Sequence, residues 1–239
     1  TDADMVGIAD LSDFPLKGTR EVNAADYIYQ IKRMAHPKLP CPIFSTMAKY
    51  IIGLDVLEQQ LAGELKRIRA ERKQARGVLY NQEMDEREKP IYLDLDQFDT
   101  EGLRVLDKYT YQIILKQKYP QLVYWLAMPF FAPIPKEADL FFTQASLVKL
   151  NLSLDNRPVG TGPYRMEKLL PNKEIVLVKN EHFRGEPYPD SGEPQDRGNG
   201  LLKDAGQTMP FVEKAIYKLE KEAIPRWNKF LQGYYEGST

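Results

Sequence analysis

Cysteine, histidine and uninterrupted apolar runs are scarce in this sequence of 239 residues. Cys41 is its one cysteine, which excludes an internal disulfide. Because His36 and His182 are the two histidines, no His/Cys zinc site can be assembled. The longest uncharged stretch, 119–135, has 17 residues and four prolines, so it is too short and too interrupted to cross a bilayer.

An excess of charge of either sign is also missing. Lys and Arg number 33 and Asp and Glu 34, a net charge of −1 that removes the electrostatic case for nucleic acid or an anionic membrane as the main partner. Apolar residues make up 43% and charged residues 28%, which is typical of globular and not of disordered chains. The chain starts at Thr1 without a signal-peptide pattern, so we expect that a leader was removed or that the chain is a piece of a longer protein.

Helical and strand patterns alternate loosely along the chain. Asn23 and Asp26 predict a capped helix that stops at Pro37. A leucine stripe predicts a long amphipathic helix from Leu54 to Arg76. The fold class is therefore α/β or mixed α+β. Other helices are expected over 43–52, 119–128, 138–152 and 225–233, the last burying Trp227, Phe230 and Leu231, and strands over 109–115, 164–166, 174–179 and 215–219.

A highly charged excursion interrupts this pattern. Residues 66–76 hold six Lys or Arg, and the charged residues of 83–101 are mostly acidic. No aromatic residue interleaves the basic run, which favours a solvated helix face over an anion site. Asp94, Asp96 and Asp99 are spaced like metal ligands, but the glycine and terminal Glu of a calcium loop are missing, which favours a structural role. We expect a helical hairpin or a mobile loop that leaves the core.

Catalysis has no support in the sequence. Neither histidine lies beside a G-x-S-x-G nucleophile motif, and both are expected to be ordinary surface residues. Val159–Tyr164 has the glycines of a phosphate loop but not its Lys and Ser/Thr, and Pro163 removes a backbone donor. A tight turn into a strand, with its glycines at unusual φ angles, is the simpler interpretation. We expect no enzyme activity, metal site or cofactor.

Four segments, in order along the chain, carry a resemblance to a known family. They are Gly18–Arg33 with Pro37, Leu106–Leu115 with Pro120, Pro158–Tyr164 with Ile175–Asn180, and Lys214–Gly233. Together they resemble the family 5 extracellular solute-binding proteins of ABC transporters, whose members include oligopeptide- and dipeptide-binding proteins. The specific motif is the G-T-G-P-Y turn, formed by Gly160, Gly162, Pro163 and Tyr164 around Thr161. Glu181 departs from the pattern, because proline usually follows the asparagine there, and Tyr235-Glu236 stands where Ile-Asp is expected.

The resemblance implies part of a periplasmic-binding-protein type II lobe. Residues 1–156 would form a helix-rich accessory subdomain of the first lobe, with a charged helical insertion at about 60–101. Residues 157–239 would form a section of the core of that lobe, leading to the hinge. Family members are longer, so we expect this chain to be an excised middle portion of one.

The implied function is that of a periplasmic, monomeric substrate-binding component, which passes peptides or similar small solutes to an ABC permease. Phe44–Tyr50 is the stretch expected to face the ligand cleft, with Phe44 and Thr46 either contacting ligand or packing internally. One alternative is a protein-interaction module that docks a partner through the charged 64–101 excursion. An enzyme is the least supported alternative, since two histidines make a base and nucleophile pair improbable.

Overall fold

The computed structural model describes residues 19–237 of the chain. The chain divides between Val159 and Gly160 into two compact units, each with its own secondary structure. Helices dominate the first unit and an antiparallel sheet the second, so the class is the mixed α/β one that the sequence predicts. None of the helices within residues 19–237 combines the length and the apolar character that crossing a membrane requires.

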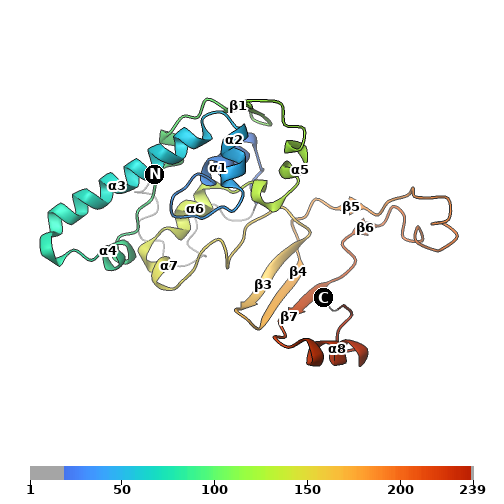
Figure 1. Ribbon diagram of the computed structural model, residues 1–239. Coiled ribbons are helices and arrows are strands. Elements are labelled where there is room, and N and C mark those ends of the chain that lie inside the picture. Colours follow the sequence, from blue (N-terminus) through green and yellow to red (C-terminus); the bar gives the residue numbers. More distant parts are fainter. Residues whose placement is uncertain (1–18, 238–239) are drawn as a thin grey trace. The chain divides into compact units, whose positions relative to one another are not determined.

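The first unit is built around three helices near its start (Figure 1). A two-stranded antiparallel hairpin pairs Leu103 with Ile113 and has a bulge between Val105 and Asp107. An isolated bridge between Ile51 and Leu115 ties this hairpin to the end of the second helix. The elements are α1 Ala24–Arg33, α2 Phe44–Tyr50, α3 Leu54–Arg76, η3 Gly77–Leu79, α4 Gln82–Glu88, η4 Leu95–Gln97, β1 Leu103–Asp107, β2 Thr110–Ile113, α5 Leu122–Leu126, η5 Pro129–Phe131, α6 Lys136–Phe142 and α7 Ala145–Lys149.

The start of α1 confirms the predicted cap. Oδ1 of Asn23 accepts a hydrogen bond from the Ala25 amide at 2.9 Å, and Oδ2 of Asp26 accepts one from the Asn23 amide at 3.0 Å. Such reciprocal bonds satisfy backbone donors that a helix start leaves unpaired. Arg20 also holds Asp26 through both of its terminal nitrogens, at 2.9 and 2.6 Å.

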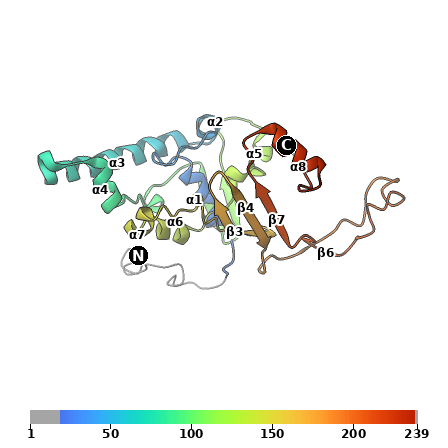
Figure 2. The ribbon, with the colours of Figure 1, turned by 90° about the horizontal axis from the view of Figure 1, so that it is seen from below.

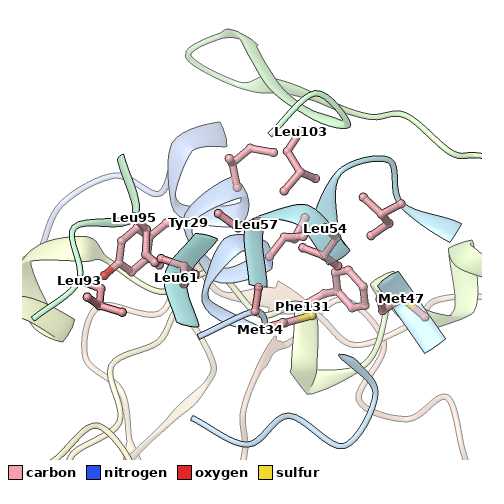
Figure 3. Packing of buried hydrophobic residues seen from close by; sticks show 14 of the residues in the cluster. Tyr29, Met34, Met47, Leu54, Leu57, Leu61, Leu93, Leu95, Leu103 and Phe131 are labelled. Carbon is pink, nitrogen blue, oxygen red and sulfur yellow. The ribbon is translucent and has the colours of Figure 1, made fainter. Parts of the chain in front are cut away.

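The apolar stripe of α3 supplies the centre of the core. Leu54, Leu57 and Leu61 are fully buried. Figure 3 shows them among residues of α1, α2, the 91–95 segment and β1. Beyond Leu65, α3 leaves the core, because Ile68 is only half-buried and Ala75 is exposed. The far end of the helix is therefore held by other interactions. Its neighbours in the core include Tyr29, Met34, Met47, Leu93, Leu95, Leu103 and Phe131.

The second unit is an antiparallel sheet with the order β3-β4-β7. Its register pairs Tyr164 with Lys179 and Ile175 with Tyr217. Figure 2 shows α8 following β7, and an extended arm between β4 and β7. Near the two ends of this arm, β5 and β6 pair in antiparallel fashion. The elements are β3 Tyr164–Leu170, β4 Glu174–Lys179, β5 Glu186–Pro187, β6 Thr208–Met209, β7 Lys214–Lys218 and α8 Ala223–Leu231.

Several element predictions need correction. The single helix expected over 138–152 is broken into α6 and α7, because the side chains of Thr143 and Gln144 bond to the last carbonyls of α6 and end it. The α8 side chains Trp227 and Leu231 are 53% and 64% exposed, so they are not buried as predicted. Trp227 instead rests against Phe230, with ring centroids 5.3 Å apart. The apolar face of α8 thus lacks cover from its own unit.

Candidate functional site

The segment between α1 and α2 surrounds a cavity of about 370 Å³. Pro37, Pro40 and Pro42 keep this segment out of a helix, since proline lacks the amide that helix bonding needs. The walls are largely apolar, with one carboxylate from α3. Among the residues that line it are Met34, His36, Pro40, Cys41, Phe44 and Glu58.

The two expected ligand contacts are placed differently. Phe44 lines this cavity and also packs against the edge of the core. Thr46 does not line it, and its backbone amide donates to the Ile43 carbonyl at 3.1 Å in the first turn of α2. The structure therefore brings Phe44, but not Thr46, into a hollow that an apolar group could enter.

His36 is not the ordinary surface residue that we expected. It is half-buried on the cavity wall, and its Nδ1 accepts a hydrogen bond from the Lys38 amide at 3.2 Å. Burial lowers its pKa to about 4, because loss of water disfavours the imidazolium more than Asp139 favours it. The imidazole is therefore neutral near pH 7. His182 is exposed, as predicted.

The cavity suits binding better than catalysis. Cys41 and His36 both line it, yet no hydrogen bond joins them in the part of the chain that the structure describes. A cysteine nucleophile needs a base within hydrogen-bond reach. Within residues 19–237, no three His, Cys, Asp or Glu side chains are grouped to hold a metal ion. An apolar hollow with one carboxylate at its rim matches the chemistry of a side-chain pocket.

Asp94 and Asp96, which are spaced like metal ligands, bind a lysine instead. Nζ of Lys136 donates to Asp94 at 2.7 Å and to Asp96 at 2.5 Å. Lys32 is buried beside them and donates to the carbonyls of Leu95 and Phe98. The acidic segment around η4 thus fixes α6 and α1 to each other, which is a structural role.

The G-T-G-P-Y turn is stabilised by hydrogen bonds from Asn180 and not by unusual glycine φ angles, as was expected. Gly160 and Gly162 do not have positive φ angles, and a Cβ on either would meet no atom within 4 Å. The prediction of unusual glycine φ angles is therefore wrong. The turn is held from outside, because Asn180 donates from Nδ2 to the Gly162 carbonyl and from its amide to the Pro163 carbonyl, both at 2.9 Å. Tyr164 Oη donates to the Val212 carbonyl at 2.9 Å.

An aromatic cluster near α2 was missed by sequence reasoning. The rings of Tyr50 and Tyr119 stack with centroids 3.7 Å apart. Trp125 donates from Nε1 to Oη of Tyr119 at 2.8 Å. These residues come from α2 and from the segment around α5, and no local periodicity links them. Only the fold brings them together.

Comparison with known proteins supports the family resemblance seen in the sequence. The sequence model for bacterial extracellular solute-binding proteins, family 5 Middle, matches residues 18–193. No match was found among curated protein sequences.

Solved structures share the fold. OppA of Burkholderia pseudomallei is 17% identical with a TM-score of 0.53, over 89% of this chain and 30% of that chain. The murein tripeptide binding protein MppA of Escherichia coli is 18% identical with a TM-score of 0.50, over 90% and 30%. OppA of Haemophilus influenzae, in complex with RPPGFSPFR, is 14% identical with a TM-score of 0.51, over 90% and 30%.

The chain thus spans about a third of the length of the structures that it matches. At these identities the likeness establishes the fold, which is part of a periplasmic-binding-protein type II architecture. The family match is independent of this likeness and covers most of the sequence. The chain therefore belongs to the bacterial extracellular solute-binding proteins of family 5.

Proposed function

We propose that this chain is part of the substrate-binding component of an ABC importer, which captures peptides or similar small solutes outside the inner membrane and delivers them to the permease. Family membership over residues 18–193 is the observation that carries the proposal. The names of two structural neighbours add support for peptides as the ligand class, since one is a murein tripeptide binding protein and another was solved with the peptide RPPGFSPFR.

Two stretches of the chain, with bounds taken from the family resemblance, have different parts in this proposed function. Residues 1–156 serve as the accessory subdomain of the first lobe, and residues 157–239 as a section of its core that leads toward the hinge. Closure of two lobes around a ligand is a known hinge motion of periplasmic binding proteins. The protein acts in the periplasm and as a monomer, and the family's extracellular character supports that location.

Ligand recognition by such a component depends mainly on backbone hydrogen bonds, while side chains enter roomy, hydrated pockets. Within this chain, the cavity beside Phe44 serves as one such pocket. Phe44 supplies apolar contact to a ligand side chain there. Thr46, on the same helix but outside the lining of the cavity, is a second proposed ligand contact. The apolar lining and the carboxylate of Glu58 favour an apolar or cationic ligand group over an acidic one.

Two other functions have less support. An enzyme needs a nucleophile and base in contact, and Cys41 and His36 are not hydrogen-bonded to each other within the described residues. A docking module that uses the 64–101 excursion would present its charges to a partner. Half of those charged side chains instead bind each other, as Arg72 and Asp85 do at 2.9 Å.

The test is thermal unfolding of the full gene product that contains this chain, with and without added ligands. Ligand at a hundred times its Kd stabilises a folded protein by about 2.7 kcal/mol, which raises the melting temperature by several degrees. We expect this rise with mixtures of di-, tri- and oligopeptides. If peptides, nickel complexes and oligosaccharides all leave the melting temperature unchanged, the protein is not a solute-binding component of this kind.

The two proposed contacts are tested with Phe44→Leu, which removes the aromatic ring, and Thr46→Val, which removes the hydroxyl at nearly the same side-chain volume. Each should weaken binding of a peptide identified in the first experiment several-fold. Tyr124→Ala, at an exposed aromatic position on α5, is the control and should leave binding unchanged. Equal affinities for the three variants and the unaltered protein would remove Phe44 and Thr46 from the site without affecting the proposed function.

A further inference from the structure

The basic residues of α3 fall into two groups. Four arginines on this helix bind acids: Arg67 binds Glu64 and Glu71, Arg69 binds Glu86, and Arg72 and Arg76 bind Asp85. Two lysines differ from them. Lys66 and Lys73 are exposed, and neither has an acidic partner among residues 19–237. Their charges are therefore uncompensated in a chain of nearly neutral composition.

Both lysines line a cavity of about 440 Å³ beside α3. Lys66, Arg69 and Lys73 are spaced by three and four residues, so they project from one face of the helix. Ala62 and Ala70 lie on that face too, and their small side chains leave the hollow open. Tyr80 and Gln82 line it from the other side. Figure 1 shows the chain turning back from the end of α3 toward α4.

Tyr80, which also lines this cavity, gives a second observation. Its hydroxyl is buried and has no hydrogen-bond partner within the described residues. An unsatisfied buried polar group costs folding free energy, so such groups are rare without a reason. A ligand with acceptor oxygens that reached this hydroxyl from the cavity would accept hydrogen bonds from it and from both ammonium groups.

The carboxylate bound to Arg69 on the cavity wall does not oppose an anion. Glu86 is already bound, by Arg69 at 2.7 Å and by Lys38 at 2.8 Å. Burial raises its pKa, but hydrogen bonds from Arg69 and Lys38 outweigh burial and hold the pKa of Glu86 below its ordinary value. Glu86 is therefore ionised and neutralised by two cations. Lys66 and Lys73 retain two free positive charges.

We propose that the cavity formed by Lys66, Lys73 and Tyr80 binds a phosphate group, at a site separate from the peptide pocket beside Phe44. A phosphate near pH 7 carries up to two negative charges, which match the two lysines, and it has more acceptor oxygens than a carboxylate. Arg69 lies on the same helix face and is held in place by Glu86. The group can belong to a free phosphate ester or to a lipid headgroup, since both present the same chemistry.

The experiment titrates inorganic phosphate into the protein and follows the amide signals of Tyr80 and Gln82 by NMR, at constant ionic strength with chloride. Saturable shifts of both signals are expected. Lys66→Gln and Lys73→Gln should each weaken phosphate binding about tenfold, the scale of one lost charge-assisted hydrogen bond. Lys49→Gln is the matched control, since Lys49 is an exposed lysine on α2 outside the cavity, and it should leave the affinity unchanged.

Tyr80→Phe separates binding from a merely structural role. This variant should bind phosphate several-fold more weakly, while its melting temperature without phosphate stays equal or rises, because the unpaired hydroxyl is gone. A fall in melting temperature with unchanged phosphate affinity would contradict the proposal. The proposal also fails if phosphate gives no saturable shift, or if Lys49→Gln weakens binding as much as Lys66→Gln.

A second arm identifies the source of the phosphate. The protein is sedimented with vesicles of phosphatidylglycerol and, separately, of phosphatidylcholine. Sedimentation with phosphatidylglycerol that is lost in Lys66→Gln supports a lipid headgroup. Binding of soluble phosphate without such sedimentation supports a free phosphate ester. Binding to neither overturns the proposal, and leaves the peptide-binding function untouched.

Discussion

Arg72 of α3 donates from Nη1 to Oδ2 of Asp85 in α4 at 2.9 Å, and Asp85 is only 2% exposed. Nη1 of Arg72 also donates to the Lys89 carbonyl at 2.6 Å, and Arg76 approaches Asp85 at 3.2 Å. This pair fixes α4 against α3 at the point where the leucine stripe has ended. The end of the long helix is thus held by a buried carboxylate and not by apolar packing.

Removal of that carboxylate should destabilise the first unit. Asp85→Ala leaves Arg72 partly buried without its anion, and breaking a buried ion pair from one side typically costs about 3 kcal/mol. Urea unfolding, followed by circular dichroism, measures the loss. Glu71→Ala is the control, because the Glu71–Arg67 pair on the same helix is exposed and should give little change. Similar losses in the two variants would show that the Arg72–Asp85 pair does not anchor α4.

Stability should also depend on pH through His36. Its pKa is lowered to about 4 in the folded protein, against 6.5 for an ordinary histidine. Burial is the main cause of the lowered pKa. The charge of Asp139 raises the pKa of His36, and the charges of Arg33 and Lys38 lower it further. Between these two pH values the unfolded chain takes up a proton that the folded chain does not. Above pH 6.5, His36 therefore causes no loss in the free energy of unfolding. As the pH drops from 6.5 toward 4, His36 lowers this free energy progressively.

The loss has an upper limit of about 3 kcal/mol, since one pKa unit corresponds to about 1.4 kcal/mol. His36→Gln cannot take up the proton, so its free energy of unfolding should vary less over the same pH range. The difference between this variant and the unaltered protein isolates His36 from the carboxylates. His182→Gln, at an exposed position, should keep the full pH dependence. If His36→Gln follows the unaltered curve, His36 is not the group responsible.

The cap of α1 gives a third prediction. Asn23→Ala removes the side-chain acceptor for the Ala25 amide and should cost about 1 kcal/mol of unfolding free energy. Asn23→Ser keeps an acceptor at the same place and should cost much less. Equal losses in urea unfolding would mean that the bond between Asp26 and the Asn23 amide, and not the Asn23 side chain, holds the helix start.

Local signals explain which elements the sequence predicts well. The bounds of α3 match the prediction because the leucine stripe from Leu54 and the glycine after Arg76 both act over a few residues. Strand β1 was not predicted, since only Leu103 of its five residues is buried and no alternation is visible. The exposure of Trp227 was also unpredictable, because an apolar helical face does not reveal whether anything covers it.

The two candidate sites also depend on contacts between distant residues, which local sequence patterns do not show. Phe44 is a candidate contact because of the family resemblance alone, and the structure adds that it lines a cavity. The cavity of Lys66 and Tyr80 has no sequence pattern, because it depends on how the chain turns at Gly77 and on which acids the neighbouring arginines bind. Long-range ion pairs such as Arg69–Glu86 decide which lysines stay free. A basic run by itself does not contain that information.

Two glycines of the first unit should respond in opposite directions to alanine. Gly102 is buried where the hairpin meets α2, and its amide donates to the Ile52 carbonyl at 3.1 Å. A Cβ there would lie 2.2 Å from that carbonyl oxygen, so the backbone must move. Gly63 lies in the middle of α3, and a Cβ on it meets nothing within 4 Å.

Gly102→Ala should therefore lower the free energy of unfolding by about 2 kcal/mol or more, the cost of overpacking against the backbone. Gly63→Ala should raise it by about 0.5–1 kcal/mol, because alanine favours the helix and restricts the unfolded chain. Urea unfolding of both variants, monitored at a probe in the first unit, compares them directly. A neutral Gly102→Ala would mean that the hairpin and the end of α2 are not in close contact, and that the bridge between Ile51 and Leu115 does not hold them together.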